Sequence, residues 1–140
     1  MSTTELLNSF EIKDRNVKDV CFFKKCEYDV HDNELVIYFT DGSYLEFSHK
    51  QSCCEEVFLY DTERDLKELI GSEIFSIEET CNESQSSFEN DDAPDEARDS
   101  FTWTFYRIKS SKGYFTLRWL GTSNGNYSES VDVDYCTESE

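Results

Sequence analysis

The strongest constraint on the fold is an Asp41-Gly42 pair that stands between two runs of β-forming residues. The first run is ELVIYFT, residues 34–40, and the second is SYLEFSH, residues 43–49. Glycine readily adopts the positive φ that a tight turn requires, so an Asp-Gly pair in this setting predicts a β-hairpin. Apolar and polar residues alternate in the second run, which predicts one buried and one solvated face.

The C-terminal half of the chain carries the same signature. FTWTFYRI (101–108), YFTLRWL (114–120) and YSESVDV (127–133) alternate between apolar and polar residues. The glycine-containing segments KSSKG and TSNGN separate them, which predicts a three-stranded antiparallel meander. Alternation and β-forming residues also indicate shorter strands around residues 20–23, 55–60 and 73–78.

One helix is expected over residues 62–70. Leu66, Leu69 and Ile70 fall on one helical face, and Gly71 follows as a C-terminal stop. A mostly antiparallel meander with one or two short helices beside it defines an α+β fold. The chain has 140 residues, which suits a single domain, and its 15% aromatic content supplies a core.

Residues 79–100, ETCNESQSSFENDDAPDEARDS, interrupt the strand pattern. They contain the only proline of the chain and many acids, with Arg98 as the single base. Like charges repel one another and long surface insertions cost little closure entropy, so we expect a flexible acidic loop between two strands. Within it, residues 83–99 are expected to be dispensable for folding and needed for partner binding.

The net charge of -18 bears on possible partners. Binding nucleic acid requires clustered lysine and arginine, so we expect no direct nucleic-acid binding and a basic protein as the partner. No stretch approaches the roughly 20 apolar residues of a membrane span, and no signal peptide is apparent, which predicts a cytoplasmic protein without membrane contact. In a reducing compartment the six cysteines are expected to be free thiols.

Several segments resemble an uncharacterised domain family of small phage and prophage proteins. They are QSCCE (51–55), DLKELIG (65–71), TWTFY (102–106), KGY (112–114) and RW-x-G-x-SNG-x-YSESV (118–131). The resemblance covers about residues 34–133 apart from the acidic loop. It implies a phage-encoded accessory protein, located in the host cytoplasm, and it implies no chemistry. By analogy, small acidic phage proteins act as inhibitors of host or defence enzymes, including DNA mimics and anti-CRISPR-like proteins.

Candidate residues for chemistry are few. His49, Cys53 and Cys54 lie close together and suggest a zinc or thiol site, but adjacent cysteines on a strand point to opposite faces. A small-ligand site, for example for a nucleotide signal, is a second alternative. Its residues are Arg118, Trp119, Asn124, Asn126 and Tyr127, of which Trp119 also has the spacing of a core residue. No cofactor is expected.

The leading expectation is therefore a non-enzymatic binding protein that covers a basic, nucleic-acid-binding surface of a host or defence protein. The acids expected to carry this contact lie in the loop and near the C-terminus: Glu89, Asp91, Asp92, Asp95, Glu96, Asp99, Asp132 and Asp134.

Overall fold

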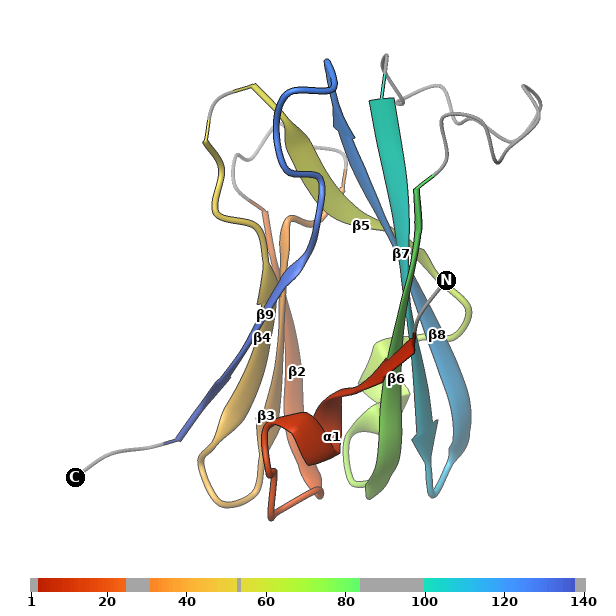
Figure 1. Ribbon diagram of the computed structural model, residues 1–140. Helices are drawn as coiled ribbons and strands as arrows, with labels where there is room; N and C mark the ends of the chain where they lie inside the picture. Colours follow the sequence, from red (N-terminus) through yellow and green to blue (C-terminus); the bar gives the residue numbers. More distant parts are fainter. Residues whose placement is uncertain (1–2, 25–30, 53, 84–99, 138–140) are drawn as a thin grey trace.

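The computed structural model describes residues 3–24, 31–52, 54–83 and 100–137 of the chain, and they form two packed β-sheets (Figure 1). The first sheet has the strand order β1-β6-β7-β8-β5 and the second has the order β2-β3-β4-β9. The strands are β1 (Thr3–Glu5), β2 (Val17–Phe23), β3 (Glu34–Phe39), β4 (Tyr44–Ser48), β5 (Glu56–Thr62), β6 (Ile74–Glu83), β7 (Ser100–Ser110), β8 (Gly113–Ser123) and β9 (Asp132–Cys136).

Every strand pairing in the two sheets is antiparallel. The two hairpins expected from the sequence are present, and the glycine at each turn has a positive φ, 93° at Gly42 and 106° at Gly113. Between β3 and β4 the Phe39 N–H donates to the carbonyl of Ser43 at 2.8 Å, which closes a three-residue loop. The Asp41 carboxylate accepts the Ser43 N–H and fixes this loop.

The main core lies between the sheets and is filled by inward-facing strand residues. Its largest fully buried side chains are Trp119, Tyr106, Phe39, Phe47 and Phe115. The α-helix α1 (Leu6–Ser9) adds Leu6 and Leu7 to this core. A second apolar cluster, on the outer face of the five-stranded sheet, consists of Phe58, Phe101, Trp103 and Leu120. Both tryptophans are thus buried, and for Trp119 this agrees with its core spacing in the sequence.

The expected α+β class is wrong, because the fold is essentially all-β. Residues 56–62 continue as β5, whose pairing with β8 extends to Thr62 opposite Leu117. What remains of the expected helix is the four-residue 3-10 helix η1 (Leu66–Leu69), which Asp65 caps through the Lys67 N–H. The spacing of Leu66 and Leu69 fits a 3-10 turn as well as an α-helix, so apolar spacing alone could not separate the two.

The expected C-terminal meander is also wrong. Strand β8 pairs with β5 and β7, and β9 crosses to the other sheet, where it pairs with β4. Strand β9 begins at Asp132, five residues later than expected, because the preceding residues form a link between the sheets. The acidic insert is shorter than expected, since β6 extends to Glu83 and β7 starts at Ser100. The residues between these strands lie outside the described part of the chain.

In residues 73–78, EIFSIE, the apolar residues do not alternate regularly with polar ones, and the geometry of β6 explains why. Its register with β7 shifts between Ile74 and Ser76, which marks a β-bulge. A bulge inserts one extra residue, so both Ile74 and Ile77 reach the core while Phe75 is 46% exposed. No helix in the described residues is long and apolar enough to cross a membrane.

Candidate functional site

The two sheets are joined at one end by a buried His–Glu pair. His49 follows β4 and Glu55 precedes β5, and His49 Nε2 lies 2.8 Å from Glu55 Oε2. The Nδ1 atom of His49 lies 2.8 Å from the carbonyl oxygen of Ser130, to which it donates. Glu55 is fully buried and also accepts the Ser52 N–H at 2.7 Å. The pair therefore ties β4, β5 and the chain before β9 together.

The segment between β8 and β9, residues 124–131, is here called the strap. Its Glu129 accepts hydrogen bonds from Thr102 Oγ1 at 2.8 Å and from Ser123 Oγ at 2.5 Å. The backbone of Glu129 packs directly against Gly121 of β8, where a Cβ atom would lie 2.0 Å from the Glu129 carbonyl oxygen. Val131 ends the strap in the main core. The strap is thus anchored to β7 and β8 of the five-stranded sheet before it reaches the core at Val131.

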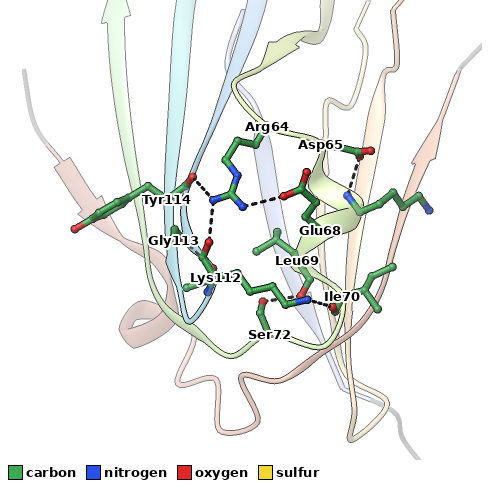
Figure 2. A network of polar contacts seen from close by, with 11 residues as sticks. Arg64, Asp65, Glu68, Leu69, Ile70, Ser72, Lys112, Gly113 and Tyr114 are labelled. Carbon is green, nitrogen blue, oxygen red and sulfur yellow. Dashed lines mark hydrogen bonds and ion pairs between the residues drawn. The ribbon is translucent and has the colours of Figure 1, made fainter.

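A second polar network fastens η1 to the β7–β8 hairpin (Figure 2). Arg64 Nη1 donates to the carbonyl oxygens of Lys112 at 2.9 Å and Tyr114 at 3.3 Å, and its Nη2 pairs with Glu68 at 2.8 Å. Lys112 Nζ donates to the carbonyl of Ile70 at 2.9 Å. The Arg64 guanidinium also stacks 4.0 Å above the Phe115 ring. Together, the contacts of Arg64 and Lys112 provide hydrogen-bond donors for backbone carbonyls at the β7–β8 turn and at the end of η1.

The segments that carry the family resemblance meet at these two junctions. QSCCE contributes Glu55 and Ser52 to the first junction, where the final motif contributes Gly121, Glu129 and Ser130. DLKELIG and KGY meet at the second junction, as Figure 2 shows. The motifs therefore contribute to the scaffold at both junctions.

A cleft of about 710 Å³ is lined by residues of α1, β6 and β9 and by the end of β4. Its wall is apolar in part, through Leu6, Phe10, Val131 and Val133. The polar residues that line it are Ser48, His49, Lys50, Glu79, Asp132 and Asp134. Asp132 and Asp134, which were predicted to contact the partner, are thus exposed side chains at the rim of this cleft.

Glu79 is held at the cleft by a buried tyrosine. The Tyr106 hydroxyl donates to Glu79 Oε2 at 2.5 Å, and the Tyr106 ring packs edge-on against Phe47 in the core. Burial and the neighbouring Glu79 carboxylate raise the pKa of Tyr106 far above its usual range. Tyr106 therefore stays a neutral hydrogen-bond donor that orients Glu79.

Four carboxylates gather on the outer face of the second sheet, beside the cleft. We call Glu34, Glu46, Asp132 and Asp134 the acidic face. Glu46 stands opposite Asp134 across the β4–β9 pairing and is hydrogen-bonded to Glu34. The Glu34 hydrogen bond, burial and the Glu34 charge raise the pKa of Glu46 to about 7. Within the described residues, none of the four carboxylates forms an ion pair with lysine or arginine.

Replacing Glu46 with glutamine is expected to stabilise the protein at pH 8 by about 1 kcal/mol, allowing for screening at a partly exposed site. The pKa of Glu46 in the folded protein, about 7, exceeds its ordinary value of 4.5. Between these values the folded protein keeps a proton that the unfolded chain has released, so the contribution of Glu46 to stability falls as the pH rises. Urea unfolding at pH 5 and pH 8 measures this. Parent and variant curves with the same pH dependence would contradict it.

Arg118 and Trp119 of the predicted ligand site lie on opposite faces of β8. Arg118 points to the outer face of its sheet and Trp119 into the core, because neighbouring strand residues alternate. Asn124, Asn126 and Tyr127 all lie in the strap, after the end of β8 at Ser123. Arg118 instead donates to Asp61 through Nε at 3.0 Å and Nη2 at 2.5 Å, and it stacks over Tyr60 and Trp103. These contacts already satisfy the charge of Arg118.

The predicted metal or thiol site is described only in part. Both ring nitrogens of His49 are engaged by Ser130 and Glu55, and Cys53 lies outside the described residues. Among the described residues, no three histidine, cysteine or acidic side chains are arranged to hold a metal ion. Cys54 is disulfide-bonded, so the expectation of free thiols is wrong for it, whereas Cys21, Cys81 and Cys136 are free. The expectation of free thiols was inferred from a reducing compartment, and such an inference does not take into account which cysteines the fold places next to one another.

Sequence reasoning found only part of the acidic surface. The loop acids Glu89, Asp91, Asp92, Asp95, Glu96 and Asp99 lie outside the described residues. Glu34, Glu46 and Glu79 were missed, although the alternation of the first hairpin places Glu34 and Glu46 on its polar face. Their proximity to Asp134 depends on the β4–β9 pairing, which links residues nearly 90 positions apart and has no local signal.

The fold and the cleft define a class: an all-β, two-sheet domain with an acidic open edge. A family model described as a domain of unknown function (DUF7448) matches residues 11–133, and the chain belongs to this family. The match confirms the expected membership of an uncharacterised domain family and starts earlier than residue 34. No curated protein and no solved structure matches the chain.

Proposed function

We propose that this protein is a non-enzymatic binding protein whose acidic face and adjoining cleft cover a basic surface of a partner protein. The observation that carries the proposal is that none of Glu34, Glu46, Asp132 and Asp134 forms an ion pair with lysine or arginine within the described residues, although Glu46 is hydrogen-bonded to Glu34 and Asp132 accepts the Lys50 N–H at 3.0 Å. The hydrogen bond to Glu34, burial and the Glu34 charge raise the pKa of Glu46 to about 7, and an incoming cationic side chain would stabilise the charged form of this carboxylate pair.

Energetic considerations favour a broad contact over one strong ion pair. An exposed ion pair contributes roughly 0–1 kcal/mol, so single acids matter little. Several aligned carboxylates steer a basic partner during its approach, and this steering weakens as salt screens it. The net charge of -18 acts in the same direction.

The proposal includes the nature of the partner. The resemblance of the family motifs to small phage proteins supports a phage-encoded protein that acts in the host cytoplasm. A nucleic-acid-binding enzyme of the host or its defences has a basic channel, and an acidic protein that occupies this channel acts as a DNA mimic. Duplex DNA and this protein then compete for the same surface.

The test compares two triple variants at pH 8, above the pKa of about 7 of Glu46, so that both lose nearly the same negative charge. One carries Glu46→Gln, Asp132→Asn and Asp134→Asn, and the matched control carries Glu63→Gln, Glu73→Gln and Glu78→Gln at exposed sites elsewhere. The tagged parent is expected to retain basic proteins from bacterial lysate at low salt, and the first variant is expected to lose them. Mass spectrometry identifies the retained proteins.

Further arms of this experiment use salt and duplex DNA. Raising the salt several-fold, and adding DNA, are both expected to release the retained proteins from the parent and from the control variant. Equal retention by the two triple variants would contradict a role for the acidic face. Retention that DNA does not reduce would contradict the DNA-mimic part of the proposal.

A further inference from the structure

Strand β9 lies at the edge of its sheet, and the strand register determines which of its backbone groups bond to β4 and which point outward. Phe39 and Ser43 form a hydrogen-bonded pair, and such pairs alternate along an antiparallel ladder. The backbone groups of Leu45 and Phe47 therefore point to β3, and those of Tyr44, Glu46 and Ser48 point to β9. Their partners on β9 are Cys136, Asp134 and Asp132. The N–H and C=O groups of the remaining β9 residues, Val133 and Tyr135, consequently point away from the sheet.

These outward-pointing groups border the cleft. Strand β9 pairs with β4 alone, and in the described residues Val133 and Tyr135 have no other backbone hydrogen-bond partner. Figure 1 shows β9 on the same open side as α1 and β6, and the cleft of about 710 Å³ lies between them. The outward-pointing backbone groups of Val133 and Tyr135 thus lie beside a cleft that has space for a further chain segment.

The two sides of β9 differ in chemistry. Val133 and Tyr135 point inward, where both pack against the core and the Tyr135 ring centroid lies 6.4 Å from that of Phe10. Asp132 and Asp134 point outward to the acidic face, next to Glu46. Residues on a paired strand share the faces of their partners, so an added strand would turn every second side chain to the apolar wall and the others to the carboxylates.

We infer that the β9 edge binds an extended segment of the partner protein by strand addition, and that this segment alternates apolar and basic residues. Its apolar side chains enter the cleft beside Phe10 and Val133, and its lysine or arginine side chains face Asp132 and Asp134. Backbone hydrogen bonds to Val133 and Tyr135 supply affinity, and the side-chain alternation supplies specificity. The inference rests on the proposed function and names the part of the partner that this site takes.

The acidic face selects the occupant of this edge. Charged edge residues discourage unwanted strand pairing. A second copy of this chain pairing edge to edge would place carboxylates opposite carboxylates, in addition to the repulsion between two molecules of charge -18. A basic strand meets no such penalty, so the same residues that exclude a second copy favour a basic partner.

The test uses short synthetic peptides as probes. One alternates lysine and valine, a second has the same composition with the lysines and valines in separate blocks, and a third alternates glutamate and valine. The alternating lysine peptide is expected to bind at least about tenfold more tightly than the block isomer, because only it can satisfy both faces of β9 at once. Equal affinity of the two lysine peptides would overturn strand addition and leave simple charge attraction.

Amide hydrogen exchange locates the contact without any substitution. The amides of Val133 and Tyr135 are expected to exchange markedly more slowly when the alternating peptide is bound. Those of Asp132 and Asp134 are expected to change little, because they already bond to β4. Unchanged exchange at Val133 and Tyr135 in the saturated complex would overturn the inference.

Two substitutions at Val133 distinguish the contribution of its backbone N–H to peptide binding from the contribution of its side chain. Val133→Pro removes an outward N–H and leaves the β4 ladder intact, whereas the matched control Val133→Ala keeps this N–H. The proline variant is expected to bind the alternating peptide roughly fivefold to tenfold more weakly than the alanine variant. If both variants bind equally, strand addition is wrong. If the partner is still lost on substitution of the acidic face, the proposed function nevertheless stands.

Discussion

The Gly121→Ala variant is expected to lose about 3–5 kcal/mol of unfolding free energy, because the added methyl group has no space to occupy. The new Cβ atom would lie 2.0 Å from the carbonyl oxygen of Glu129 and 2.8 Å from the carbonyl carbon. Both are backbone atoms, so no side-chain rotation relieves the clash. The strap must move, and it then loses the hydrogen bonds of Glu129 to Thr102 and Ser123.

Gly125→Ala is the matched control for this variant. Gly125 has a positive φ of 99°, but its Cβ atom would meet nothing closer than Ser100 Cβ at 4.0 Å. Only the backbone conformation opposes this substitution, at a cost of about 1–2 kcal/mol. Urea unfolding of both variants compares the free-energy cost of a steric clash at Gly121 with the cost of an unfavourable backbone conformation at Gly125. A Gly121→Ala variant no less stable than Gly125→Ala would show that the strap does not pack against β8.

The second large effect is expected at the His49–Glu55 pair. His49→Ala should destabilise the protein by about 3–5 kcal/mol, because it removes the imidazole that contacts the fully buried Glu55 carboxylate at 2.8 Å. The same substitution releases the carbonyl of Ser130 from its hydrogen bond. Thermal or urea unfolding measures the loss.

A double-mutant cycle isolates the pair from the packing around it. Once Glu55 is replaced by alanine, the imidazole has no carboxylate to satisfy, so His49→Ala should cost much less in the Glu55→Ala background. A coupling free energy of about 1–3 kcal/mol is expected. Additive effects of the two substitutions would mean that His49 and Glu55 contribute independently, contrary to the 2.8 Å contact.

Both predictions concern residues within or next to the family motifs, and both concern stability. The acidic face behaves differently, since Asp132 and Asp134 are exposed and their replacement by asparagine should leave the fold intact. Scaffold and binding surface can therefore be tested separately, which makes the charge variants informative about function.

The sequence by itself determined most of the strands. The Asp41-Gly42 turn and the alternation around it predicted β3 and β4 nearly to the residue, and the alternation in 101–120 predicted β7 and β8. It also indicated Trp119 as a core residue. These features are local, because side-chain alternation and turn conformation depend on neighbours only a few residues away.

Only the tertiary structure decided which strands pair and where helix gives way to strand. Residues 56–62 extend as β5 because β8 offers a partner strand, and β9 joins β4 because Gly121 lets the strap cross between the sheets. The cleft, the acidic face and the open edge at Val133 and Tyr135 all follow from that crossing. Each depends on residues distant in sequence, whose pairing is set by packing of the whole core and leaves no periodic signal in the chain.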